Sequence, residues 1–308
     1  MKLSIITINY NDAKGLAKTL KSVASQVLSD KVLNDGFSLE HIIVDGGSTD
    51  GSIEVIKEYA SRNINDHQSA INFHLEVKWV SEKDKGVYNA MNKGIKMASG
   101  EYIQILNAGD ILASNEVLAK VRGKMEELRT TDASYPEMIY GNMLVDGGEG
   151  NFAGSKEIEY SLRQYYTSTM NHDCCWIKRT LFVNENANEN VNRCYGLYDE
   201  NLKIVSDWKW FLQAIGLGHV KPVYVDIDMT IFEGGGISSI QVEKRNAERR
   251  KVLEEVLPPA VLADYDKHAF DMHQMDNLRK HPWAYKLVWT LERILNRLDN
   301  RNFKKPKK

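Results

Sequence analysis

The chain has 308 residues, of which 43% are hydrophobic and 27% are charged, and its formal net charge at pH 7 is −2. A chain of this size and composition buries a sizeable core, as one large globular domain or as two smaller ones. Because the charges nearly cancel, no overall positive field favours nucleic acid as a partner.

The cysteines and the apolar runs indicate where in the cell the protein is expected. Cys174 and Cys175 are sequence neighbours, which make a poor disulfide, and Cys194 leaves an odd number; no spacing of Cys and His indicates zinc. The N-terminal apolar run is too short and polar for a signal peptide, and no run of about 18 apolar residues could span a bilayer. We therefore expect a cytoplasmic protein that is neither secreted nor membrane-spanning.

The first half of the chain alternates strand patterns with helix patterns. Residues 3–8 are a β-branched run that stops at Asn9, and apolar residues then recur at helical spacing. The same pattern returns at residues 42–44, where the turn "DGGSTDG" separates a buried strand from a second helix. Further strands are predicted at 73–79 and 102–106. This alternation predicts a mostly parallel sheet with right-handed crossovers.

A parallel sheet gathers the loops that follow its strands along one edge, where ligands bind. Asn9, Asp45, Asp84 and Asp110 each follow a predicted strand. The sequence therefore predicts that these four side chains share one site, although they are far apart along the chain.

The pattern changes after residue 115. A helix to about residue 128 precedes "MIYGNMLVDGGEGNF", which predicts a β-hairpin, and Ser206 or Asp207 is placed to cap a later helix. Residues 223–232 predict one more strand, and from residue 241 the chain is helical and highly charged.

Taken in order, "SIITINYN", "VDGGSTDGS" and "SEKDKGVYNAMNKGIKMASGEYIQILNAGD" resemble the inverting nucleotide-sugar glycosyltransferases of family 2, which have the GT-A fold. "NHDCCWIKRTLF", "YDENLKIVSDWKWFLQA" and "FEGGGISS" resemble its bacterial surface-polysaccharide branch. The resemblance covers residues 1–240 and implies a nucleotide-sugar half, about 1–114, and an acceptor half, 115–240. Residues 241–308 are expected to form a helical basic extension.

Two other functions compete with the one that this resemblance implies. A dinucleotide-binding dehydrogenase needs a Gly-x-Gly-x-x-Gly turn after the first strand, and "INYNDAKG" lacks it. A GT-A-like protein that binds nucleotide-sugar without transferring it, as an assembly partner, stays open.

The resemblance implies a set of donor-binding residues at the strand ends. The first aspartate of the family's DDG segment, which contacts the base, corresponds to Asp45. For Asp45 the competing interpretation is an Asx-turn that only shapes the loop, and for Asp84 and Lys85 it is a solvated loop. The expected donor-binding residues are Asn9, Tyr10, Asp45, Asp84, Lys85 and Asn107.

A divalent cation, Mn²⁺ or Mg²⁺, is implied because it stabilises the charge on a leaving diphosphate. In "ILNAGD", Asn107 falls on the first aspartate of the family's Asp-x-Asp motif and Gly109 on the second, which is the usual ligand. Asp110 is the nearest carboxylate and is the expected metal ligand, since hard cations prefer oxygen. A turn aspartate that caps the next helix is the alternative.

Inverting transfer needs a base that takes a proton from the acceptor hydroxyl, and the resemblance places Asp207 in that role. A plain helix cap is the alternative, unless Ser206 caps instead. His172 and Trp208 fall on the acceptor side, although a lone His is often only packed and aromatic residues at helical spacing are usually core.

The C-terminal segment is basic and amphipathic. Residues 277–308 hold ten lysines and arginines against two acids, and Trp283 begins an apolar stripe at helical spacing. Such a helix binds either its own domain or an anionic membrane surface, and the second would suit an enzyme with a lipid-linked acceptor. The sequence thus predicts transfer of a sugar, with a UDP-sugar as the expected donor, to a glycan or lipid-linked glycan in polysaccharide biosynthesis.

Overall fold

A computed structural model describes residues 1–28, 36–65, 73–129, 134–145, 161–184, 194–234, 236 and 240–303. The chain divides into two compact units, Met1–Val252 and Leu253–Lys308. The first unit thus continues beyond residue 240 and includes most of the helix that follows.

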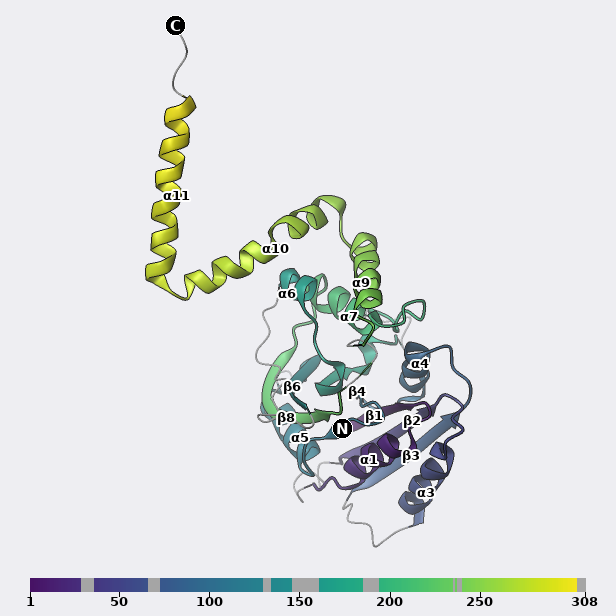
Figure 1. The fold of residues 1–308 in the computed structure, drawn as a ribbon. Helices are drawn as coiled ribbons and strands as arrows, with labels where there is room; N and C mark the ends of the chain where they lie inside the picture. Colours follow the sequence, from purple (N-terminus) through teal and green to yellow (C-terminus); the bar gives the residue numbers. More distant parts are fainter. Residues whose placement is uncertain are drawn as a thin grey trace. The chain divides into compact units, whose positions relative to one another are not determined.

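Within the described part of the first unit, eight strands form one sheet in the order β3-β2-β1-β4-β7-β6-β8-β5 (Figure 1). Their bounds are β1 Lys2–Asn9, β2 Ser38–Asp45, β3 His74–Ser81, β4 Tyr102–Ile105, β5 Ile111–Leu112, β6 Met138–Val145, β7 Cys175–Lys178 and β8 Val223–Phe232. Strands β3, β2, β1 and β4 are parallel, as expected from the alternating pattern. Strand β7 is antiparallel to both β4 and β6, so the second half makes the sheet mixed. The expected α/β class is confirmed.

Helices flank this sheet and continue into the second unit. In the first unit they are α1 Ala13–Ala24, α3 Ser52–Asn65, α4 Val87–Met97, α5 Val117–Glu127, α6 Leu162–Thr167 and α7 Ser206–Phe211, with short helical turns η1 His172–Cys174, η2 Arg179–Leu181 and η3 Leu212–Gly216. Helix α9, Val242–Val256, crosses the boundary, and α10 Pro259–Arg279 and α11 Pro282–Phe303 follow.

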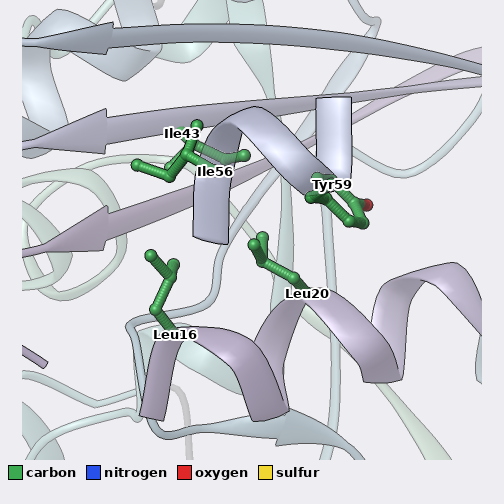
Figure 2. Packing of buried hydrophobic residues seen from close by; sticks show 5 residues of the cluster. All are labelled: Leu16, Leu20, Ile43, Ile56 and Tyr59. Atoms are coloured by element: carbon green, nitrogen blue, oxygen red, sulfur yellow. The ribbon is translucent and has the colours of Figure 1, made fainter. Parts of the chain in front are cut away.

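Apolar side chains fix α1 and α3 on one face of the sheet. Leu16 and Leu20 of α1 meet Ile43 of β2 and Ile56 and Tyr59 of α3, all buried (Figure 2). Alternate residues of a strand point to opposite faces, so the neighbour of Ile43, Ile42, faces away from this cluster. This packing holds the loops after β1 and β2 at the same edge of the sheet.

Helix α4 approaches β1 and β2 closely at Gly94. A Cβ added there would lie 2.3 Å from Cγ2 of Ile6, so any larger residue would force the helix away from the strand. The loop before α4 is thereby kept near the strand ends.

Two local expectations need comment. The start of α7 differs from expectation, because Val205 is the N-cap residue and no side chain caps the helix. The Asp207 carboxylate is therefore not used as a cap and is available for other contacts. The Gly-rich turn and the second strand of the expected hairpin fall within residues 146–152, outside the described residues, and the first strand, β6, pairs with β7 and β8.

The helices of the second unit carry exposed apolar side chains. On α11, Trp283 is 73% exposed and Leu295 is 59% exposed. None of the helices in the described residues has both the length and the apolar character needed to cross a membrane.

Candidate active site

A cavity of about 940 Å³ opens where β1, β2 and β4 end. Its lining includes residues from both halves of the first unit. Asp45, Lys85 and Asp110 are absent from the part of that lining that the structure describes. The predicted site residues that line it are Asn9, Tyr10, Asp84, Asn107, His172, Asp207 and Trp208.

Asp45 is buried next to Gly46 and Gly47, which line the cavity, and it organises the turn after β2. Its carboxylate accepts hydrogen bonds from Asn9 Nδ2 at 2.8 Å, Ser48 Oγ at 2.5 Å and Ser81 Oγ at 2.6 Å, and also from the Gly47 and Ser48 amides. Although burial alone would raise the pKa of Asp45, these donors lower it, because they favour the charged form. Asp45 thus fixes Asn9 at the cavity edge, and its contact with a nucleoside stays a prediction.

Asp84 and Tyr10 meet beside Gly46. A Cβ at Gly46 would lie 2.6 Å from Asp84 Oδ2 and 3.0 Å from Tyr10 Cδ2, so a larger residue here would have to displace these two side chains. Asp84 also accepts from the Gly86 amide at 2.9 Å, just before α4, and Tyr10 is 67% exposed. The backbone carbonyl of Lys85 accepts from Lys203 Nζ at 3.1 Å.

The loop after β4 buries Asp110 behind residues that line the cavity, close to His172 and Asp173. Gly109 has φ +98°, a left-handed conformation that an L-residue adopts only with strain, and its amide donates to Thr19 Oγ1 at 3.0 Å. A Cβ at Gly109 would also lie 2.4 Å from Glu233 Oε2. An aspartate at this position would therefore be disfavoured by the backbone, and Glu233 would have to move to make room for it.

Asp110 is a buried carboxyl with few donors. Its Oδ1 accepts from the Glu233 amide at 3.1 Å. Burial, followed by the charge of Asp173, raises the pKa of Asp110 to about 7. Burial likewise raises the pKa of Asp173, whose Oδ2 has no hydrogen-bond partner among the described residues. Two neighbouring buried carboxyls of this kind have oxygens to offer to a cation.

Asp207 is held at both carboxylate oxygens. Tyr88 of α4 donates to Oδ1 at 2.8 Å, and His172 Nδ1 lies 3.1 Å from Oδ2. On its other side, His172 Nε2 is 3.2 Å from Asn107 Nδ2. These contacts join α7, α4, η1 and the loop after β4 in one network that faces the cavity.

The charges in this network are coupled. Burial lowers the pKa of His172, but the hydrogen bond to Asp207 and the charge of Asp173 outweigh it and raise the pKa to about 9. Burial raises the pKa of Asp207, and the hydrogen bond from His172 and the His172 charge lower it below its usual range. At neutral pH the imidazole is therefore protonated and the carboxylate ionised, so of these two groups only Asp207 can accept a proton. Because Nε2 of the protonated imidazole is a donor, its contact with Asn107 Nδ2 is then not a hydrogen bond.

Trp208 has little ring surface left for a ligand. Its side chain is 3% exposed, its Nε1 donates to the Tyr165 carbonyl at 2.7 Å, and the guanidinium carbon of Arg249 lies 4.5 Å from the ring centroid. The ring face toward Arg249 is therefore not open to a sugar.

Comparison with known proteins identifies the family. The family described as "Glycosyl transferase family 2" matches residues 4–184, which is more than half of the chain. The chain belongs to glycosyl transferase family 2.

Two curated relatives are similar to this family 2 chain. A "PGL/p-HBAD biosynthesis glycosyltransferase" of Mycobacterium bovis is 25% identical over 247 residues, which cover 80% of this chain and 82% of the relative. An uncharacterized glycosyltransferase of Mycobacterium tuberculosis is 33% identical over 118 residues, 38% of this chain and 37% of that one.

Solved structures share the fold at low identity. S. aureus TarS 1–349 in complex with UDP has a TM-score of 0.56 at 18% identity, and the match covers 91% of this chain and 75% of that one. A mannosyltransferase from Pyrobaculum calidifontis, in complex with GDP-Man and Mn²⁺, has a TM-score of 0.55 at 16% identity, covering 92% and 72%. With another S. aureus TarS chain the match covers 84% of this chain and 41% of that chain. The likeness shows that the α/β fold is GT-A.

Several residues at this cavity were not predicted from the family 2 motifs. Tyr88, Asp173, Arg245 and Arg249 all line it. Asp173 directly follows His172, so an acidic neighbour was a signal that could have been used. The other three lie on helices, where the sequence gives no sign of which turn faces the cavity.

Proposed function

We propose that this family 2 chain transfers one sugar from a nucleoside-diphosphate donor to a hydroxyl of a glycan or lipid-linked glycan, with inversion. One observation carries the proposal: the ionised carboxylate of Asp207 faces the same cavity as Asn9, Tyr10 and Asp84. A nucleotide-sugar and a hydroxyl can both be accommodated there, with the base on the hydroxyl side. Transfer in polysaccharide biosynthesis is part of the same proposal.

The donor half of the proposal rests on the strand ends. Asn9, Tyr10 and Asp84 offer an amide, an exposed aromatic ring and a carboxylate to a nucleoside, and Asp45 holds Asn9 in place. TarS has been crystallised with UDP-GlcNAc, at 18% identity to this chain. We therefore propose a UDP-sugar as the donor, with Lys85 and Asn107 as further contacts.

A divalent cation, Mn²⁺ or Mg²⁺, fits the chemistry of the oxygens here. Asn107 Oδ1 and Asp173 Oδ2 are buried and have no hydrogen-bond partner among the described residues. Burial and the charge of Asp173 raise the pKa of the Asp110 carboxyl. In the described part of the chain no three His, Cys, Asp or Glu side chains are grouped closely enough to hold a metal by themselves. Diphosphate oxygens and water would complete such a shell, and the bound cation would stabilise the leaving diphosphate.

The acceptor half of the proposal assigns the proton transfer to Asp207. Each carboxylate oxygen has two lone pairs, so the bonds from Tyr88 and His172 leave room for an acceptor hydroxyl. Asp207 takes the hydroxyl proton as the oxygen attacks the anomeric carbon, and the bond to the diphosphate breaks on the opposite face. His172 holds the carboxylate in place and keeps it ionised.

A thermal-shift screen tests the proposed function. UDP- and GDP-sugars are added to the protein with and without Mn²⁺, and a donor that binds only the native state raises the melting temperature. We expect a shift with a UDP-sugar that is larger with Mn²⁺. No shift with any nucleotide-sugar would contradict the proposal. A shift without consumption of the donor under any acceptor would instead favour the non-catalytic assembly partner.

We further propose that α11 binds an anionic membrane surface peripherally. Its apolar side chains Trp283, Leu287 and Leu295 are more than half exposed, and lysines and arginines accompany them. A helix with one apolar and one basic side binds at the boundary of headgroups and acyl chains. This location would bring the enzyme to a lipid-linked acceptor.

Deleting residues 278–308 is expected to abolish binding to vesicles that contain phosphatidylglycerol. The apolar area that α11 would bury in the membrane would be lost, and so would the attraction of its basic residues to anionic lipid, about 1 kcal/mol for each residue. Vesicle flotation measures this, with neutral phosphatidylcholine vesicles as the control. Binding of the shortened protein equal to that of the full chain would contradict the proposal.

A further inference from the structure

Helix α9 turns two arginines toward the cavity. Arg245 and Arg249 are four residues apart, so they lie on the same side of the helix, and both line the cavity. Neither has a role in the donor, metal or base assignments above.

Arg249 is held in a fixed orientation. Its guanidinium lies over the ring of Trp208, and its Nη2 donates to the Ser168 carbonyl at 2.6 Å. Burial, together with the charge of Arg245, lowers the pKa of Arg249 to about 10. Arg249 therefore stays charged at neutral pH, and it lies close enough to Arg245 for the two charges to repel each other.

Glu248, which lies between the two arginines on α9, holds the loop before α7. Glu248 accepts hydrogen bonds from the backbone amides of Lys203 at 3.0 Å and Ile204 at 2.8 Å. Lys203 also lines the cavity, and its Nζ donates to the carbonyl of Lys85. The contacts that hold Lys203 and Arg249 are thus made to carbonyl oxygens, which leave their positive charges to act on a ligand.

Arg249 lies on the side of the cavity where Asp207 is. Trp208, which Arg249 covers, is the neighbour of Asp207 in α7, and the charge of Asp207 acts on Arg249. A ligand held by the arginines would therefore lie beside the base. That is the side on which the acceptor hydroxyl must be.

We propose that Arg245 and Arg249, with Lys203, form a subsite for an oxyanion of the acceptor, a phosphate or a sugar carboxylate close to the attacking hydroxyl. The inference rests on the proposed function and adds the chemical class of its acceptor. A guanidinium presents two parallel donors that match the oxygens of either group. Bringing a negative charge between two positive ones also relieves their repulsion, and the bound oxyanion orients the hydroxyl toward Asp207.

Binding of two small probes tests the subsite. Inorganic phosphate and methyl glucuronide are titrated by calorimetry into the protein already saturated with UDP and Mn²⁺, so that the place of the leaving diphosphate is filled. We expect at least one probe to bind, and the stronger of the two identifies the oxyanion. In Arg245→Gln and Arg249→Gln its Kd should rise about tenfold or more, since a bond to a charged group is lost.

The variants are controlled for charge and for folding. Lys251→Gln removes one positive charge from an exposed position of α9 and should leave the Kd of the probe unchanged. Arg249→Lys keeps the charge above Trp208 but loses the paired donors, so it should bind the probe more weakly than wild type. Thermal unfolding of each variant shows whether the Trp208 packing survives, and Arg245→Gln tests the subsite without changing that packing.

The affinity for UDP separates the possible failures. The subsite predicts a UDP Kd that is the same in wild type and both Gln variants. If the Gln variants bind UDP more weakly by the same factor as they bind the probe, the arginines bind the leaving diphosphate and the proposed subsite is overturned. Equal binding of the probe to wild type and variants, or none to wild type, overturns it as well. Failure of wild type to bind any nucleotide would instead overturn the proposed function.

Discussion

Asp207→Asn is expected to slow sugar transfer about 10²- to 10⁴-fold while the Kd of the nucleotide donor stays close to that of wild type. The amide has the same shape and can still accept a hydrogen bond from Tyr88, but it cannot take a proton. Transfer is measured as release of the nucleoside diphosphate, and donor binding by calorimetry. Near-normal transfer in this variant would remove Asp207 as the base.

The same variant should change the titration of His172. The hydrogen bond and charge of Asp207 help to raise the pKa of His172 to about 9, so their loss should lower that pKa. NMR of the imidazole nitrogens follows it without any substrate. Asp199→Asn is the matched control, because Asp199 pairs with Lys209 of α7 at 2.9 Å but does not line the cavity. It should keep most of the activity and leave the His172 pKa unchanged.

A fall in pH from 8 to 6 is expected to weaken Mn²⁺ binding in the presence of UDP. The pKa of Asp110 is raised to about 7. Below pH 7 protons therefore compete with the cation for the carboxylate, and above pH 7 the carboxylate is ionised and can bind the cation. The Kd for Mn²⁺ should therefore be nearly constant above pH 8 and rise by up to about tenfold per unit well below pH 7. Electron paramagnetic resonance of free Mn²⁺ measures this directly.

Asp110→Asn separates this effect from the titration of UDP, whose terminal phosphate has a pKa of about 6. The variant should bind Mn²⁺ more weakly at pH 8 and keep only the pH dependence that UDP contributes. Asp226→Asn, which changes an exposed carboxylate of β8, should behave like wild type. An unchanged pH profile and Mn²⁺ affinity in Asp110→Asn would mean that the cation is held elsewhere and that the loop after β4 is only a turn.

The strand and helix order of the nucleotide-sugar half could be predicted because its signals are local. A β-branched run such as residues 3–8 followed by a polar turn and a helical pattern depends only on neighbours in sequence. The meeting of Asn9, Asp45 and Asp84 near one edge then follows from parallel strands, whose carboxyl ends lie together. The family motifs sharpen this part but are not needed for it.

The N-cap of α7 and the burial of Asp110 were harder to predict from the sequence. Ser206 has the right chemistry for a cap, yet Val205 is the N-cap residue and the Ser206 hydroxyl has no partner in the described structure. Asp110 follows a strand as Asp45 and Asp84 do, but after the left-handed turn at Gly109 its side chain is buried and is absent from the described lining of the cavity. An N-cap preference is a local effect of about 1 kcal/mol, which the packing of the surrounding elements easily outweighs.

By itself, the sequence determined the α/β class, the order of the first four strands along the chain and that their following loops share an edge, since these follow from hydrophobic periodicity and from parallel pairing. Only the tertiary structure decided that Tyr88 and His172, 119 and 35 residues from Asp207, hold its two oxygens. It also decided that Arg249 covers Trp208 and brings a positive charge to the cavity. Contacts between distant segments depend on how helices and strands pack in three dimensions, and no periodicity along one chain records which side chains then meet.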